Sequence, residues 1–222
     1  MIRGGDANKK RVGLFGGTFN PIHQGHLRGA EEIRDGLGLA EIVFIPAAIP
    51  PHKGTRDLVD GKHRLEMVRR AISDNPFFRV SDIEIRREGK SYSIETIRHF
   101  RRADPDSEIY FILGQDAFLE IETWKDFQDL FSLSHFVVMV RLPVGEPPGP
   151  PPLPSTLREV FRFDPGHQVW VHRSGHELHF REITCLDISS TKVRRLIADK
   201  KSPKYLIPKE VAIYIEEHGL YR

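Results

Sequence analysis

The sequence predicts an α/β protein built on a doubly wound, mostly parallel sheet, with helices on both faces and a small helical part at the C-terminus. Short apolar runs alternate with stretches in which apolar residues recur every three or four positions, the pattern of strands alternating with helices. The chain has 222 residues, of which 39% are hydrophobic and 29% charged. That length and composition are sufficient for one sizeable buried core.

The elements can be assigned in order along the chain. In the first half we expect strands over residues 11–17, 41–47, 78–85 and 108–114. Three amphipathic helices should lie between them, because apolar residues there share one helical face. These stripes are Leu27, Ala30, Ile33 and Leu37; then Leu65, Val68 and Ile72 within residues 62–73; then Ile94, Ile97 and Phe100.

The second half continues the pattern around one interruption. We expect a helix over 124–133, a strand over 135–142, two short strands around Ser174–Gly175, and helices over 190–199 and 208–218. Residues 143–154 are so rich in proline that they should form an irregular or polyproline II connector. We therefore expect a single domain over 1–222, with a flexible tail over 1–10 and C-terminal helices over 188–222.

Charge and cysteine content exclude several protein classes. The 33 Lys and Arg nearly balance the 31 Asp and Glu, which argues against a nucleic-acid partner. An RNA-binding interpretation would rest only on the dispersed pairs Arg69–Arg70, Arg86–Arg87 and Arg101–Arg102. We expect no membrane span and no secretory signal, since no apolar run is long enough. The single cysteine, Cys185, can form neither an internal disulfide nor a cysteine zinc site, so a cytoplasmic location is expected.

The strongest chemical signal is residues 16–27, which read GGTFNPIHQGHL and come directly after the first strand. Ligands bind open α/β sheets beyond the carboxyl ends of the strands. Gly16 and Gly17 leave room for backbone N–H groups to approach a phosphate. His23 and His26 begin the next helix, whose N-terminus favours an anion. The loop is neither a Walker A loop nor a GxGxxG fingerprint, and its histidines do not have metalloprotease spacing.

A second anion-binding pattern occurs far along the chain, in residues 187–195, which read DISSTKVRR. Ser189 and Ser190 are suited to capping a helix start. Arg194 lies in the first turns of that helix, where a cation opposes the helix dipole unless an anion shares the site. Hydroxyls and a guanidinium there would hold a polyphosphate. If both junctions belong to one sheet, the two segments should form a single phosphate site.

These two motifs resemble the HxGH loop and the ISSTxxR helix start of the nucleotidylyltransferase superfamily, which has a Rossmann-like fold. Further segments resemble the bacterial nicotinate mononucleotide adenylyltransferases within it. They are IPPHK at 49–53, SYSIETI at 91–97, FILGQD at 111–116, TWKDF at 123–127 and the terminal GLYR. The resemblance covers nearly the whole chain from residue 11 onward, apart from the proline-rich connector and part of the segment after it.

The resemblance implies adenylyl transfer from ATP to nicotinate mononucleotide, with deamido-NAD and pyrophosphate as products. It implies a site for ATP and a site for the mononucleotide, with His23, His26 and Arg194 as catalytic residues. The ATP site would also contain Gly16, Gly17, Thr18, Phe19, Gly114, Asp116, Ile188, Ser189 and Ser190. The mononucleotide site would contain His52, Lys53, Tyr92, Ser93, Trp124 and Arg141. Asp116 could instead cap a helix, and Trp124 could instead belong to the core.

Three points stay open at the level of sequence. Mg²⁺ is expected with ATP, although no residues form a dedicated metal cage, because Mg²⁺ often binds through substrate phosphates and water. The acceptor could instead be nicotinamide mononucleotide or phosphopantetheine, and a module that binds ATP without turnover is a further alternative. A homo-oligomer is compatible with the sequence.

Overall fold

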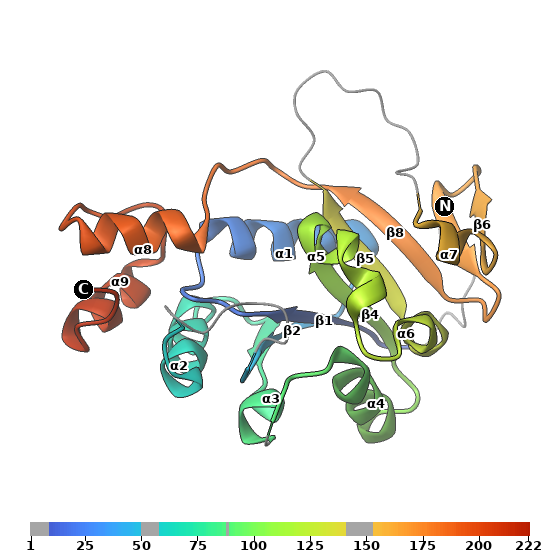
Figure 1. The fold of residues 1–222 in the computed structure, drawn as a ribbon, viewed down its shortest axis with the longest axis horizontal. Helices are drawn as coiled ribbons and strands as arrows, with labels where there is room; N and C mark the ends of the chain where they lie inside the picture. The colour runs from blue at the N-terminus through green and yellow to red at the C-terminus, as the bar shows by residue number, and fades with distance from the viewer. Residues whose placement is uncertain (1–8, 50–57, 88, 141–152) are drawn as a thin grey trace.

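The computed structural model describes residues 9–49, 58–87, 89–140 and 153–222, and these contain an eight-stranded sheet (Figure 1). The strand order is β3-β2-β1-β4-β5-β8-β7-β6. From β3 to β8 neighbouring strands are parallel, and β7 and β6 add an antiparallel edge. The strands are β1 (Arg11–Gly17), β2 (Glu41–Pro46), β3 (Phe78–Val80), β4 (Glu108–Gly114), β5 (His135–Val140), β6 (Phe161–Asp164), β7 (Val169–His172) and β8 (Glu177–Glu182).

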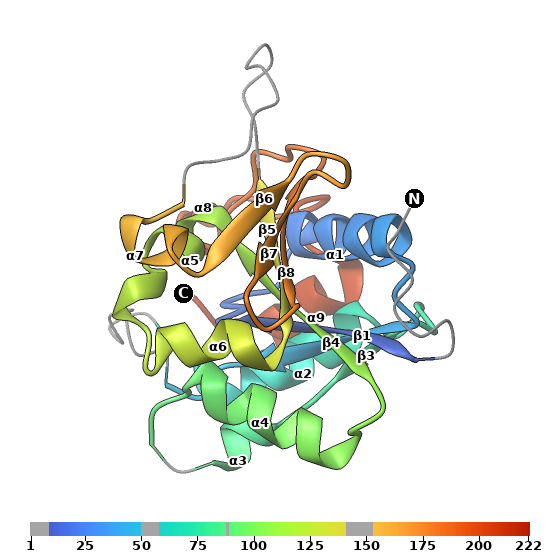
Figure 2. The ribbon, with the colours of Figure 1, turned by 90° about the vertical axis from the view of Figure 1, so that its right-hand side faces the viewer.

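Helices cover both faces of this sheet, as predicted. One buried cluster joins the sheet to α1, α2, α8 and α9, and a second joins its other face to α4, α5, α6 and α7. Figure 2 shows α1 and α4 on opposite sides of the strands. The helices are α1 (Gln24–Leu37), α2 (Gly61–Ala71), α3 (Ile83–Arg86), α4 (Ser93–Ala103), α5 (Gln115–Leu119), α6 (Phe127–Leu133), α7 (Ser155–Arg158), α8 (Ser190–Ala198) and α9 (Lys209–Glu217). The doubly wound α/β prediction is confirmed.

Three local predictions were wrong. Residues 78–85 were expected to form one strand, but β3 ends at Val80 and α3 comes next, because the Ser81 hydroxyl accepts the backbone N–H of Ile83 and starts a turn. The face of α2 was expected to bury Leu65, whereas its neighbour Arg64 is fully buried and Leu65 is only half-buried. The strand β6 was not predicted; it forms by antiparallel pairing with β7, a contact that local periodicity does not reveal.

The C-terminal helices lie at one end of the molecule, next to α1 (Figure 1). The backbone N–H of Gln24, the first residue of α1, donates to the carbonyl of Leu206 at 2.9 Å. Val193 of α8 is fully buried in the same cluster as Ile33 of α1. The last part of the chain is therefore anchored where α1 begins. None of the helices in the described ranges is long and apolar enough to cross a membrane.

Candidate active site

The predicted phosphate loop lies at the carboxyl edge of the sheet. β1 ends at Gly17, next to Pro46 at the end of β2, and Gly114 ends β4 on the other side of β1. The chain after β1 forms the loop of residues 18–23 and then enters α1. In open parallel sheets this edge is where ligands bind.

The glycines of the loop are required by close packing. A Cβ on Gly17 would lie 2.8 Å from the ring of Phe19, and one on Gly16 would lie 3.3 Å from the ring of Phe111. Phe19 itself has a φ of 46°, which is unfavourable for a bulky residue, yet its side chain is only 2% exposed. Burial of the ring thus offsets the cost of this backbone conformation and holds the loop in its turn. Thr18 is half-buried between these positions.

His23 and His26 form one stacked pair at the start of α1. Their ring centroids are 3.6 Å apart with an interplanar angle of 22°. His23 is the N-cap residue and is 3% exposed, whereas His26 is half-buried. The backbone N–H of His23 donates to Nδ1 of His26 at 3.2 Å. Because Nδ1 accepts a hydrogen bond, the ring proton of His26 lies on Nε2, which makes that nitrogen a donor.

The late motif lies directly against this loop, as predicted. Nη1 of Arg194 donates to the carbonyl oxygen of Asn20 at 2.9 Å, and the Ser190 hydroxyl donates to the carbonyl of Pro21 at 2.9 Å. Ser189 caps α8, its hydroxyl accepting the backbone N–H of Lys192. The segments around residues 20 and 190 are therefore held together by direct hydrogen bonds. Ile188 is buried in the cluster beneath them.

The structure adds three side chains that sequence reasoning missed. Oδ1 of Asn20 accepts hydrogen bonds from the Tyr221 hydroxyl at 2.8 Å and from the backbone N–H of Val59 at 3.3 Å. Burial raises the pKa of Tyr221 far above its usual range, so the phenol keeps its proton and remains a donor. Arg64 donates to the carbonyl of Thr18 from below the loop. The terminal GLYR segment was a sequence signal for Tyr221, but nothing local marks Arg64 as buried.

On the β4 side, Gly114 and Asp116 stand at the start of α5. Gly114 is the N-cap residue of this helix, so Asp116 does not cap it. Asp116 lies in the first turn and is exposed. The alternative in which Asp116 serves only as a helix cap is therefore wrong, and its carboxylate faces solvent at the carboxyl edge.

The segments around Tyr92 and Trp124 lie side by side. Tyr92 is the N-cap residue of α4, Ser93 is its first residue, and Lys125 Nζ lies 4.6 Å from the centroid of the Tyr92 ring. Lys125 also pairs with Glu95 of α4 at 2.9 Å. Trp124 is half-buried and packs edge-on against Phe111, with ring centroids 6.2 Å apart. Its ring thus belongs partly to the core and is partly open to solvent. His52, Lys53 and Arg141 lie outside the described residues.

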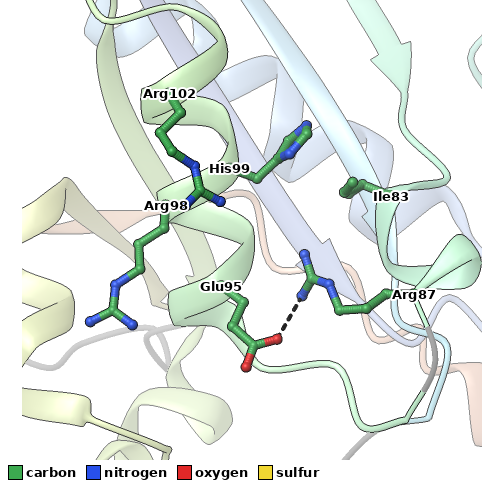
Figure 3. A pocket seen from close by; sticks show the side chains of 6 residues that line it. All are labelled: Ile83, Arg87, Glu95, Arg98, His99 and Arg102. Carbon is green, nitrogen blue, oxygen red and sulfur yellow. Dashed lines mark hydrogen bonds and ion pairs between the residues drawn. The ribbon is translucent and has the colours of Figure 1, made fainter.

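A hollow of about 440 Å³ lies between α3 and α4, and none of the predicted site residues lines it (Figure 3). It is lined by Ile83, Arg87, Glu95, Arg98, His99 and Arg102. Members of two of the arginine pairs that are dispersed in the sequence therefore meet at one hollow. Arg87 pairs with Glu95 at 3.4 Å, and Arg98 pairs with Asp129 at 3.7 Å. These ion pairs offset much of the local positive charge.

One group of metal-type side chains lies at the opposite, amino edge of the sheet. His135, Glu177 and His179 place one ligand atom each within 4.8 Å of one another, the only such group in the described part of the chain. However, Nδ1 of His135 accepts the backbone N–H of Glu177 at 3.1 Å, which places the ring proton on Nε2. Neither ring nitrogen of His135 then offers a free lone pair to a cation. The group is better described as a partly buried cluster of two histidines and a carboxylate.

Comparisons with known proteins show what this chain is similar to over most of its length. A family model described as cytidylyltransferase-like matches residues 14–196. A probable nicotinate-nucleotide adenylyltransferase of Syntrophotalea carbinolica is 47% identical over 96% of this chain and 97% of its own length. A protein of the same description from Desulfitobacterium hafniense is 42% identical over 98% of both chains. A nicotinic acid mononucleotide adenylyltransferase of Plasmodium falciparum complexed with NaAD has a TM-score of 0.70 at 20% identity, covering 96% of this chain and 97% of its own.

Proposed function

This chain belongs to the cytidylyltransferase-like family, and we propose that it transfers the adenylyl group of ATP to nicotinate mononucleotide, releasing deamido-NAD and pyrophosphate in NAD biosynthesis. The relatives that share 41–47% identity over nearly its full length have this activity in their descriptions. The two substrates are ATP and the mononucleotide. With one cysteine, which is exposed and free, the chain suits the reducing cytoplasm that we propose as its location.

A single contact carries the proposal. Arg194 donates to the carbonyl of Asn20 at 2.9 Å, so the two anion-binding motifs, 174 residues apart, form one surface. The start of α8 and the loop before α1 then face the same ligand. Two helix starts with donors and a cation at one sheet edge match a triphosphate better than any single phosphate.

We assign His26 to the reacting centre. In the in-line reaction, a phosphate oxygen of the mononucleotide attacks the α-phosphorus of ATP while the bond to the β-phosphate oxygen breaks. Negative charge builds up on the α-phosphoryl oxygens and on the leaving oxygen. The Nε2 proton of His26 can be donated to such an oxygen as a hydrogen bond, and stacking on buried His23 fixes the plane of the ring. No covalent enzyme intermediate is needed.

We assign the departing pyrophosphate to the start of α8. Ser189, Ser190 and Arg194 would hold the β- and γ-phosphates, with the loop from Gly16 to Phe19 beneath them. The guanidinium of Arg194 donates one N–H to the carbonyl of Asn20 and another to Thr191 Oγ1, which fixes its position, and its remaining N–H groups would donate to phosphate oxygens. A fixed cation stabilises the leaving group without reorganisation during the reaction.

We assign the acceptor to the segment after β2, the start of α4 and the residues around Trp124. The N-terminus of α4, at Ser93, carries a partial positive charge that favours the nicotinate carboxylate over a neutral amide. The exposed part of Trp124 can stack on the pyridine ring. By the family resemblance, His52, Lys53 and Arg141 would contact the mononucleotide phosphate.

Mg²⁺ is proposed to accompany ATP. It prefers oxygen ligands and keeps several waters, so the phosphates supply most of its coordination. The donors identified at the site, hydroxyl, guanidinium and imidazole N–H groups, are suited to phosphate oxygens rather than to the cation. The exposed carboxylate of Asp116 is the acidic group that we place nearest the nucleotide. When bound, the ion would neutralise phosphate charge.

Pyrophosphate release tests this function. The purified protein is incubated with Mg²⁺ and ATP plus nicotinate mononucleotide, nicotinamide mononucleotide or phosphopantetheine in separate reactions. We expect the fastest release with nicotinate mononucleotide. Faster release with the amide would replace the acceptor assignment, and no release with any acceptor would leave an ATP-binding module without turnover.

A further inference from the structure

Arg64 is the largest side chain in the fully buried set, and its guanidinium has an unusual environment. Its exposed fraction is 0%, and it donates to three backbone carbonyls: Nε to Val59 at 2.8 Å, Nη1 to Thr18 at 2.8 Å and Nη2 to Ala48 at 3.0 Å. Within the described ranges it makes no ion pair with a carboxylate. A cation this deeply buried is costly unless its donors are well satisfied.

The three carbonyls belong to two different substrate segments. Thr18 lies in the loop after β1, which we assign to the ATP phosphates. Ala48 and Val59 flank the segment after β2, which we assign to the acceptor. One rigid, planar guanidinium therefore joins Thr18 to Ala48 and Val59.

Further hydrogen bonds extend this connection on both sides. The backbone N–H of Ala48 donates to the Ser91 hydroxyl at 2.9 Å, next to Tyr92 and Ser93. The backbone N–H of Val59 donates to Asn20, whose carbonyl accepts from Arg194. The acceptor side and the triphosphate side are thus linked through the backbone groups that Arg64 holds.

The positive charge of Arg64 also supports a role at the phosphate site. Burial lowers the pKa of Arg64, but arginine starts so high that the guanidinium stays protonated. Its hydrogen-bond partners in the described structure are carbonyl dipoles rather than anions, and the charge of the Asp60 carboxylate favours its protonated form. A buried cation directly beneath the phosphate loop also favours phosphate binding.

We propose that Arg64 is a positioning residue that sets the separation between ATP and the acceptor. The proposal rests on the proposed function. In-line attack requires the acceptor oxygen to lie about 3–3.5 Å from the α-phosphorus, and a displacement of about 1 Å can lower the rate about 100-fold. Arg64 holds Thr18 together with Ala48 and Val59, so its loss affects the reaction of two bound substrates more than the binding of either one.

The test compares Arg64→Lys and Arg64→Met with Arg70→Met, a control on the same helix. Arg70 stacks on Tyr214 and pairs with Glu66, at the contact between α2 and α9. We expect Arg64→Lys to lower kcat about 100-fold while the Kd for ATP alone and for nicotinate mononucleotide alone changes less than about 3-fold. Arg64→Met should lose the same kcat and also bind both substrates more weakly. Arg70→Met should lower the melting temperature with kcat unchanged.

Two results would overturn the proposal. Full kcat in folded Arg64→Lys would show that only the positive charge matters. A lower melting temperature of either Arg64 variant, with unchanged kcat per folded molecule, would show that Arg64 has a structural role only. If neither Arg64 variant folds, Ser91→Ala decides. Loss of its hydrogen bond to Ala48 should lower kcat about 5-fold at unchanged Kd, and unchanged kcat contradicts the proposal. Absence of turnover in the unmodified protein would instead refute the proposed function, which separates the two failures.

Discussion

Histidines gather at both edges of the sheet, and their surroundings differ. At the carboxyl edge, His23 and His26 stack at the start of α1, beside Arg194 and the hydroxyls of α8. At the amino edge, His135 stacks on Tyr110 with ring centroids 4.5 Å apart, and His179 lies 3.1 Å from Glu177. The first pair faces donors and a cation, and the second group faces a carboxylate and a phenol.

Two histidines at the amino edge, His135 and His176, are held neutral by burial. Burial lowers the pKa of His135 to about 3 and that of His176 to about 4. Their ring nitrogens are used within the fold, because His135 accepts the Glu177 N–H and His176 Nδ1 lies 3.0 Å from the Ser174 hydroxyl. A cluster of histidines therefore indicates a functional site only where the strand ends, helix starts and neighbouring charges also favour a ligand.

The largest expected effect is at the carboxyl edge. His26→Ala removes the Nε2 donor at the reacting centre and should lower turnover by about 100-fold or more, with little change in melting temperature. Pyrophosphate release measures it. His99→Ala, an exposed change on α4, serves as control and should leave turnover unchanged. Turnover near that of the unmodified protein in His26→Ala would remove the residue from the mechanism.

Adjacent arginines on α8 provide a matched pair. Arg194→Met removes the cation bonded to Asn20 and should lower kcat/KM for ATP by about 10-fold or more, because the leaving pyrophosphate loses a charged donor. Arg195→Met changes an exposed neighbour and should have little effect. Steady-state kinetics with ATP varied distinguishes them. Equal losses in both variants would show that only the general charge of α8 matters.

The histidines at the amino edge should make the free energy of unfolding depend on pH in the acid range. The pKa of His135 and of His176 is lowered in the fold, so unfolding takes up protons between the ordinary value near 6.5 and these lower values. Stability is therefore complete above about pH 6.5 and falls as the pH drops towards about 3–4, by up to about 1.4 kcal/mol per pH unit for His135. Half-buried His176 contributes less.

Urea unfolding between pH 7.5 and pH 4.5 measures this dependence. His176→Gln should make the unfolding free energy depend less on pH, while turnover at pH 7.5 stays unchanged because the residue lies far from the carboxyl edge. Loss of turnover in this variant at neutral pH would contradict the separation between the two edges.

Glu84 should give the smallest effect. Burial raises its pKa, although the Thr96 hydroxyl donates to it at 2.7 Å. A raised pKa means that its contribution to stability is present below about pH 4.5 and is lost as the pH rises, so at neutral pH the buried charge destabilises the fold. Glu84→Gln should raise the unfolding free energy at pH 8 by an amount on the order of 1 kcal/mol. The gain should vanish near pH 4, which chemical unfolding at both pH values can check.

Most of the sheet could be predicted from sequence because its strands are short apolar runs, as in β4, and its long helices carry clear stripes, as in α1. The prediction failed where partners are distant. Nothing in the local pattern indicates that Arg64 rather than Leu65 is buried, because its three acceptors lie on other segments. In the same way, β6 depends on its pairing with β7.

The candidate site shows the same limit. Gly16, Gly17, His23 and His26 are close together in sequence, so one motif reveals them. The side chain of Asn20 accepts hydrogen bonds from Tyr221 and Val59, far along the chain, and no local pattern predicts such contacts. Motifs thus identify the groups that meet the substrates, whereas the groups that hold the loops in place require the folded structure.

A crystal structure with a non-hydrolysable ATP analogue tests the central claim most directly. We predict that its triphosphate lies between His26 and the start of α8, with Nε2 of His26 near the α-phosphate and Arg194 within hydrogen-bond distance of the terminal phosphates. A triphosphate that contacts the imidazole pair without reaching Ser189, Ser190 or Arg194, or that binds at another edge of the sheet, would contradict the account.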